Sequence, residues 1–208
     1  MSVIYLVRHG QASLGAEVYD ELSRTGRHQA SLVGSALSRR DTPAIVVSGG
    51  LRRHRQTVEH SGLGAGQVDP RWNEFDHEPI LAAAPIPVGT SSADAVQLWQ
   101  AAKERWSSGL YDSEYPESYK AFAARVNAAF DEVAADLPRG QCAVVVTSAG
   151  VIASLVTTSP MGIGGDWNRL QRVVVNTGVT KVIVGTAEST LVSFNDHSHL
   201  DADDITYR

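Results

Sequence analysis

Three short runs of apolar, mostly β-branched residues constrain the fold of this chain more than any other feature. They are Val3–Val7, Ala44–Val47 and Ala143–Thr147. None of them alternates between apolar and polar residues, as a strand with one solvated face does. Strands that are buried on both faces belong to parallel sheets covered by helices above and below. The sequence therefore predicts an α/β fold.

Segments with helical spacing separate these runs. The stretch from Leu22 to Arg40 predicts a helix with Ala30, Val33 and Leu37 facing inward. Residues 117–137 predict a second helix, because large apolar side chains recur there every three or four positions. Strands that alternate with helices indicate a three-layer αβα sandwich around a mostly parallel sheet.

Two further segments complete the expected domain. Val179–Val184 and Thr190–Phe194 flank a short loop and predict a hairpin that adds an antiparallel edge to the sheet. Residues 71–115 do not follow the strand–helix rhythm, and we expect a short helix around Ala93–Trp106. We therefore predict a single domain over residues 1–208, in which the region around 71–115 forms a lid that shapes specificity.

Composition excludes several classes of protein. The chain has 208 residues and a formal net charge of −5, which argues against nucleic acid as its main partner. No apolar run is long enough to span a membrane, and the first residues do not resemble a signal peptide. Cys142 is the only cysteine, so no internal disulfide forms. We expect a cytoplasmic protein.

The loops after the three buried strands carry the residues with the most distinctive chemistry. Arg8, His9 and Gly10 follow the first strand directly, residues 48–59 (SGGLRRHRQTVE) follow the second, and residues 148–155 (SAGVIASL) follow the third. Because the carboxyl ends of parallel strands meet at one edge of a sheet, we expect these loops to converge on one crevice.

These loops have the composition of an anion site. Arginine forms a planar fork of hydrogen bonds to phosphate, and we expect Gly10 to let an anion approach the backbone. The second loop leads into a helix whose first turn carries Arg52 and Arg53. Ser148 and Ala149 stand at another helix start, where backbone N–H groups are free to bind anions. Several donors aimed at one point predict a phosphate group.

A phosphate site gives His9 a chemical role. A neutral imidazole can attack phosphorus and form a covalent phosphohistidine. The leaving oxygen then needs a proton, and Glu74 is the best candidate acid, expected to be partly buried among aromatic neighbours. Asp76 and Glu78 are close enough in sequence to compete for that role. The alternative for the first loop is a capped strand end with a surface pair of polar residues.

Two motifs resemble those of a known family. LVRHGQAS resembles the signature of the histidine phosphatase superfamily, also called phosphoglycerate mutase-like, and SGGLRRHRQT is similar to its second motif. The resemblance extends to NTGVT and FNDHSHL and so covers nearly the whole chain. It implies that His9 is the phosphorylated nucleophile, that Arg8 and Arg53 bind phosphate and that Glu74 donates the proton. It also implies chemistry without a metal or another cofactor.

The sequence departs from that family pattern at two positions. Ser148 stands where the family has a second histidine, and a serine donates a hydrogen bond but carries no positive charge. We expect that loss to cost about a hundredfold in rate. Gly15 stands where many members have an asparagine that contacts phosphate, and Ser13 is the expected substitute.

Other polar residues near the motifs are predicted to be solvated. We expect Arg52, His54 and Arg55 to form an exposed basic helix face. His197 and His199 lie in an acidic C-terminal segment whose spacing fits no zinc or calcium pattern, so we predict a solvated tail.

The combined expectation is a phosphatase that hydrolyses a small phosphomonoester through a phosphohistidine. Its partner would be a small phosphorylated substrate, with no nucleic acid or membrane involved. Two alternatives stay open at this point. One is mutase-type phosphoryl transfer on phosphoglycerate, and the other, prompted by Ser148, is a pocket that binds phosphorylated ligands without turnover.

Overall fold

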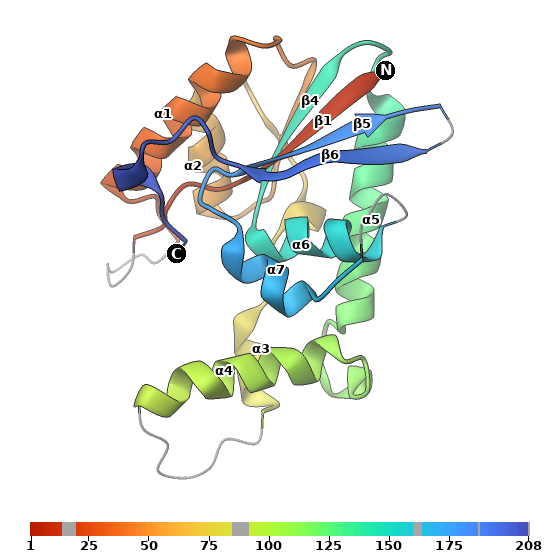
Figure 1. Cartoon of the computed structure of the whole chain (residues 1–208). Helices are drawn as coiled ribbons and strands as arrows, with labels where there is room; N and C mark the ends of the chain where they lie inside the picture. The colour runs from red at the N-terminus through yellow and green to blue at the C-terminus, as the bar shows by residue number, and fades with distance from the viewer. Residues whose placement is uncertain (14–19, 85–91, 160–163, 187, 208) are drawn as a thin grey trace.

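The computed structural model describes residues 1–13, 20–84, 92–159, 164–186 and 188–207. Within this part of the chain, a six-stranded sheet with the order β3-β2-β4-β1-β5-β6 forms the centre of the molecule (Figure 1). The strands are β1 Ser2–Arg8, β2 Ile45–Ser48, β3 Gln67–Val68, β4 Cys142–Thr147, β5 Val179–Val184 and β6 Ser189–Asp196.

The pairing of the strands confirms the predicted sheet. β1 pairs with β4, β4 with β2 and β2 with β3, all in parallel. The predicted hairpin is β5 and β6, which add an antiparallel edge beside β1. The sequence did not predict β3, because a strand of two residues is too short to carry a pattern.

Helices cover both faces of the sheet, which confirms the three-layer αβα sandwich (Figure 1). α1 and α2 lie on one face, and α5, α6 and α7 lie on the other. Their bounds are α1 Arg24–Ser38, α2 Arg52–Ser61, α3 His77–Ala82, α4 Ser92–Ser107, α5 Tyr119–Asp136, α6 Ala149–Thr158 and α7 Trp167–Val173, with 3₁₀ turns at Pro70–Trp72, Asp112–Glu114 and Ala202–Asp204.

Strand β1 shows why the buried runs lack alternation. Tyr5 and Val7 point into the core under α1 and α2, whereas Ile4 and Leu6 point into the larger core under α5 and α6. All four side chains are at most 4% exposed. Each such side chain stabilises the fold by about 1.5–3 kcal/mol relative to an exposed position. Burial on both faces holds the end of β1, and the residues that follow it, in a fixed place.

Helices α3 and α4 form an arm that projects from the sandwich below α7 (Figure 1). α4 matches the helix predicted around Ala93–Trp106, whereas α3 was not predicted. Phe75 and Trp106 pack against each other at the joint, with ring centroids 5.0 Å apart, and Phe75 also contacts Trp167 at 5.4 Å. Trp167 donates from Nε1 to the Gly150 carbonyl oxygen at 2.9 Å. This cluster ties the arm to the start of α6.

The C-terminal tail is exposed at Asp201 and Asp203, as predicted, but its backbone also binds the body of the protein. Gln29, which is fully buried on α1, donates to the Asp204 carbonyl oxygen at 2.7 Å. The Thr206 carbonyl oxygen accepts from the Asn176 N–H at 2.9 Å. The tail therefore returns beside α1 to the carboxyl end of β1 (Figure 1). Its acidic side chains had suggested solvation, but its backbone makes the contacts.

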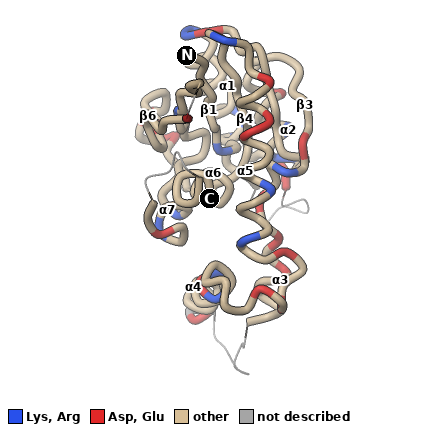
Figure 2. The backbone as a smooth tube through the Cα atoms, turned by 90° about the vertical axis from the view of Figure 1, so that its right-hand side faces the viewer, with Lys and Arg blue, Asp and Glu red and all other residues tan. Residues whose placement is uncertain are grey.

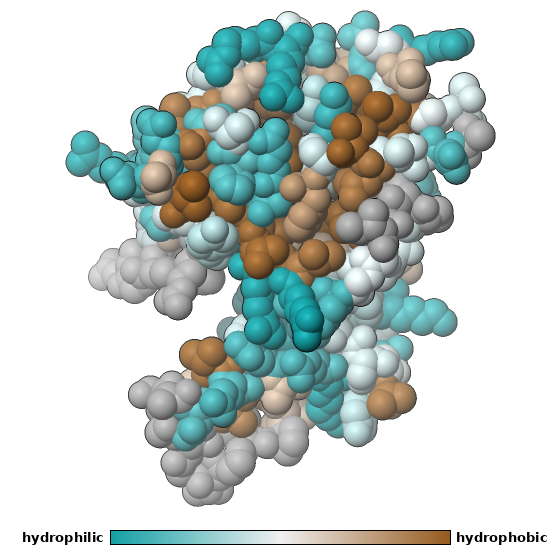
Figure 3. Space-filling model, in the orientation of Figure 1, coloured by the Kyte–Doolittle hydropathy of each residue, from teal (hydrophilic) through white to brown (hydrophobic). Residues whose placement is uncertain are grey.

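The surface matches the mixed composition of the chain. Acidic and basic residues are interspersed along the body and on α4 (Figure 2). Hydrophilic side chains cover α7 and the junction between the sandwich and the arm on the face shown in Figure 3. Among the described helices, none is both long and apolar enough to cross a membrane.

Candidate active site

The loops after β1, β2 and β4 meet at one cavity of about 280 Å³. Five of the residues singled out in the sequence line it: Arg8, His9, Arg53, Glu74 and Ala149. The cavity lies beyond the carboxyl ends of the parallel strands, where ligands bind in open α/β sheets.

His9 is held rigidly at the end of β1. Its N–H donates to the Thr147 carbonyl oxygen at 2.8 Å, and its side chain is buried. Its Nδ1 donates to the Gly10 carbonyl oxygen at 2.7 Å, which places the ring proton on Nδ1 and leaves a lone pair on Nε2. Burial lowers the pKa of His9 well below its usual value, and the neighbouring Arg53 and Arg8 lower it further. His9 is therefore a neutral imidazole whose Nε2 carries a lone pair.

Arg53 points at that nitrogen from the first turn of α2. Its Nε donates to His9 Nε2 at 3.2 Å. Its other end is fixed, because one terminal nitrogen donates to an Asp20 carboxylate oxygen at 2.6 Å. Arg53 thus places a positive charge next to the atom that would carry a phosphoryl group.

Arg8 lines the same cavity and is only 8% exposed, so the alternative of a surface pair at the end of β1 does not hold. Both of its terminal nitrogens donate to the Tyr207 carbonyl oxygen at 3.1 Å, and one also donates to the Val174 carbonyl oxygen. The returning C-terminal segment therefore orients the guanidinium group.

Glu74 is the only one of the three candidate carboxylates that lines the cavity. It is half-buried, whereas Asp76 and Glu78 are exposed and Asp76 caps the start of α3. Glu74 Oε2 accepts from the Gly150 N–H at 3.0 Å. A Cβ atom at Gly150 would overlap Glu74 Oε1, so glycine is needed there for this contact.

Gly10 has a different role from the one expected. A Cβ atom at this position would overlap the Gly26 backbone on α1, so glycine allows the loop and the helix to pack closely. The Gly10 N–H is already engaged, because it donates to Thr57 Oγ1 at 3.0 Å. Ser13 lies next to the cavity residue Ala12 but is not itself part of the lining. Gly15 lies outside the described residues.

Ser148 does not line the cavity either. It is buried at the N-cap of α6, next to the lining residue Ala149. Its Oγ lies 2.7 Å from Nε2 of His54. His54 is fully buried, so the prediction that it belongs to a solvated helix face is wrong, although its neighbours Arg52 and Arg55 are exposed.

The motif NTGVT holds the backbone of the loop that carries Arg8 and His9, a role that its residue types did not reveal. Asn176 donates from Nδ2 to the His9 carbonyl oxygen at 3.1 Å, and the Thr177 N–H donates to the Arg8 carbonyl oxygen at 3.0 Å. Both residues are fully buried. Thr177 adopts a φ of 60°, a strained value for a β-branched residue, as is common at functional sites.

Four lining residues that the sequence did not assign to the site come from the arm and α7: His77, Trp99, Lys103 and Gln171. Burial lowers the pKa of both His77 and Lys103. Trp99 and Lys103 are four residues apart on one helix face, which is the only signal that linked them. These residues extend the cavity away from His9.

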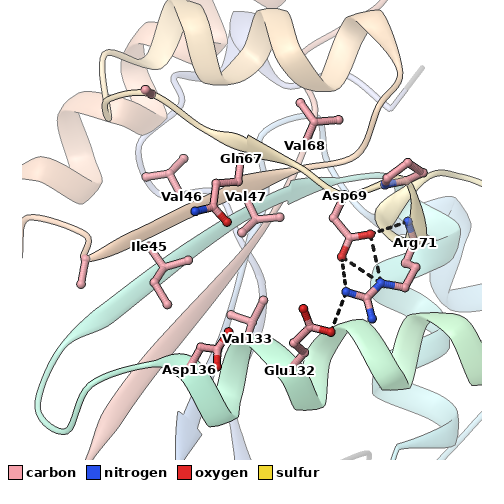
Figure 4. Close-up of a pocket in the computed structure, with 13 residues that line it drawn as sticks. Ile45, Val46, Val47, Gln67, Val68, Asp69, Arg71, Glu132, Val133 and Asp136 are labelled. Carbon is pink, nitrogen blue, oxygen red and sulfur yellow. Dashed lines mark hydrogen bonds and ion pairs between the residues drawn. The ribbon is translucent and has the colours of Figure 1, made fainter.

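A larger cavity of about 560 Å³ lies at the β3 edge of the sheet, between β2, β3 and α5 (Figure 4). Its polar wall is an ion-pair cluster in which Arg71 binds Asp69 at 2.7 Å and Glu132 at 2.8 Å. The other wall is aliphatic. The Arg71 guanidinium group is already paired with two carboxylates, so this cavity offers little for phosphate. Among the described residues, no three His, Cys, Asp or Glu side chains are grouped to hold a metal ion.

The sequence model of the histidine phosphatase superfamily (branch 1) matches residues 4–197. No curated protein matches the sequence.

Several solved structures share the fold. A mycobacterial glucosyl-3-phosphoglycerate phosphatase in complex with inorganic phosphate is 24% identical with a TM-score of 0.65, and the alignment covers 96% of this chain and 99% of that one. A mutant phosphoserine phosphatase from Entamoeba histolytica, bound to phosphoserine, is 19% identical with a TM-score of 0.66 over 96% of this chain and all of that one. YhfR from Bacillus stearothermophilus is 19% identical with a TM-score of 0.64, over 96% and 99% of the two chains.

Proposed function

Because this chain belongs to the histidine phosphatase superfamily, we propose that it hydrolyses small phosphomonoesters through a phosphohistidine at His9. One observation carries the proposal. The Nε2 lone pair of a neutral, buried His9 faces Arg53 Nε at 3.2 Å, inside a cavity that Glu74 also lines. A nucleophile, a cation for the developing charge and an acid are thus within one small site.

In the first step, the His9 Nε2 lone pair forms a bond to phosphorus while the bond from phosphorus to the ester oxygen breaks. Arg53 and Arg8 stabilise the charge on the phosphoryl oxygens. Glu74, in its protonated form, gives its proton to the leaving oxygen, so the product departs as a neutral alcohol.

In the second step, Glu74 has become a carboxylate and acts as a base. It takes a proton from a water molecule, whose oxygen attacks phosphorus as the bond to His9 Nε2 breaks. Inorganic phosphate leaves, and both His9 and Glu74 return to their starting protonation states.

The cavity beyond His9 supports a small substrate. A volume of about 280 Å³ suits a metabolite better than a phosphoprotein surface, and His77, Trp99 and Lys103 would contact the group that carries the phosphate. The two phosphatases named above act on phosphoserine and glucosyl-3-phosphoglycerate. Those two compounds are the first members of the substrate panel to be tested.

We propose the cytoplasm as the location of the protein.

The decisive experiment measures hydrolysis of an aryl phosphate by the wild type and by His9→Ala. We expect turnover that disappears in His9→Ala and persists in His28→Ala, a matched control on the surface of α1. Brief incubation with a ³²P-labelled ester should label the wild type and not His9→Ala. If the protein binds phosphate but hydrolyses the ester at no pH between 4 and 8, the proposal of a phosphatase is refuted.

The mutase alternative is separated by a second assay. The protein is incubated with phosphoglycerate, with and without the bisphosphorylated activator, and both phosphate release and isomer formation are measured. We expect release to exceed isomer formation. The opposite ratio would make the chain a mutase.

A further inference from the structure

His54 is a buried imidazole next to the candidate nucleophile, and the reaction described above does not use it. It follows Arg53 on α2, is fully buried, and its ring centroid lies 5.5 Å from that of His9. The chain makes room for it, because a Cβ atom at Gly49 would overlap His54 Nδ1. An alanine or any larger residue at position 49 would displace the ring.

Burial of this imidazole costs free energy that its contacts do not fully offset. Among the described residues, His54 Nδ1 has no hydrogen-bond partner. A buried polar atom without a partner costs about 1–3 kcal/mol, and an apolar side chain would avoid this cost. Burial and the charge of Arg53 lower the pKa of His54 well below its usual value, so the ring is neutral and carries one proton.

Among the described residues, the hydrogen bond that the His54 side chain makes is the one to Ser148. A serine at an N-cap normally uses its oxygen to accept from a backbone N–H of the first helical turn. Ser148 makes no such bond, and Glu74 accepts from the Gly150 N–H instead. Glu74 therefore replaces Ser148 as the cap of α6. The Ser148 hydroxyl group is left to His54.

We propose that His54 is a positioning residue that donates from Nε2 to Ser148 Oγ and thereby directs the Ser148 hydroxyl hydrogen toward the phosphoryl group on His9. A hydroxyl group has one hydrogen, and acceptance from His54 leaves that hydrogen free to be donated. Ser148 lies between Thr147, whose carbonyl oxygen accepts from the His9 N–H at 2.8 Å, and Ala149, which lines the cavity, so Ser148 stands beside the His9 loop although it is not itself part of the lining. This assignment rests on the phosphatase function proposed above.

The test compares His54→Gln with His54→Asn. Both are neutral amides of similar polarity, but glutamine carries its amide nitrogen at the reach of Nε2, whereas asparagine carries it near the position of Nδ1. Only His54→Gln can still donate to Ser148. Each substitution is made alone and together with Ser148→Ala. For every variant, kcat and KM are measured with an aryl phosphate, and the free energy of unfolding is measured separately.

We expect His54→Gln to retain most of kcat and His54→Asn to lose about 10- to 100-fold, which is the value of one hydrogen bond to a charged group. In the Ser148→Ala background the two variants should have equal kcat, because the residue through which His54 acts has gone. A merely structural role predicts a difference that persists in that background and follows the unfolding free energy. Equal kcat with Ser148 intact, or a difference that persists without it, would overturn the assignment.

Binding of inorganic phosphate, measured by calorimetry on the same proteins, separates this proposal from the proposed function. If the wild type does not hydrolyse the ester, the phosphatase proposal is refuted. Phosphate binding still tests whether His54 positions Ser148. We expect His54→Asn and Ser148→Ala to weaken phosphate binding by about tenfold or more and His54→Gln to leave it close to the wild type. Equal dissociation constants for all of them would refute the role of His54.

Discussion

Thr57 connects the two loops that carry the candidate nucleophile and its arginine. Its Oγ1 accepts from the Gly10 N–H at 3.0 Å and donates to the Arg53 carbonyl oxygen at 2.7 Å. The residue is fully buried. We predict that Thr57→Val, which keeps the shape but removes the hydroxyl group, damages both stability and activity.

The magnitude follows from the Gly10 N–H. The backbone of Gly26 packs against Gly10, so no water molecule easily replaces the hydroxyl group. A buried N–H without a partner costs about 1–3 kcal/mol in the free energy of unfolding. The residue before Gly10 is His9, the candidate nucleophile. A shift of its side chain by an ångström costs on the order of 100-fold in kcat. Thr57→Ser is the matched control, because it keeps the hydroxyl group and loses one methyl group worth about 0.8 kcal/mol.

Two measurements test this prediction. Urea unfolding is monitored by tryptophan fluorescence, and kcat is measured with an aryl phosphate. We expect Thr57→Val to lose activity while Thr57→Ser keeps kcat close to the wild type. Amide hydrogen exchange at Gly10 should accelerate in Thr57→Val alone. If Thr57→Val keeps the wild-type kcat, or if its Gly10 N–H exchanges no faster than in Thr57→Ser, then this hydroxyl group does not hold the nucleophile loop and the reasoning fails.

Three further predictions concern charge and protons at the site. Glu74→Gln should lower kcat by about 10²- to 10⁴-fold for alkyl phosphates, whose leaving oxygen needs a proton, and much less for p-nitrophenyl phosphate; equal losses for both esters would contradict the acid role. Arg53→Lys keeps the charge but loses the fork that reaches both Asp20 and the phosphoryl site, so kcat should fall by about 10²-fold or more, whereas a fully active variant would show that charge alone suffices. The pKa values of His9 and His54 are held below that of an unfolded histidine, mainly by burial and then by Arg53. The unfolded chain therefore binds more protons, and the stability from this source is complete above pH 6.5. It falls below that pH by up to about 1.4 kcal/mol per pH unit for each histidine. Urea unfolding from pH 7.5 to 5.5 should show this decline, with a shallower slope in His54→Gln.

Much of the framework follows from local patterns in the sequence. The buried strands, the long helices and the hairpin were predicted to within a few residues, because each depends on the spacing of apolar side chains within one short segment. The convergence of the strand-end loops was also predictable, since a parallel sheet brings its carboxyl ends to one edge. These rules placed His9 and Arg53 in one site, whereas Glu74 was assigned from its aromatic neighbours and from the family resemblance.

Contacts between distant segments were decided only by the tertiary structure. A histidine among the arginines at positions 52, 53 and 55 has the pattern of a helix surface, yet His54 is buried because Gly49 makes room for it and Ser148 binds it from 94 positions away. The C-terminal segment is acidic and was expected to be solvated, yet the Tyr207 carbonyl oxygen accepts from both terminal nitrogens of Arg8 and orients it. In both cases the burial of a polar group depends on a hydrogen-bond partner far along the chain, and periodicity within one segment carries no information about that partner.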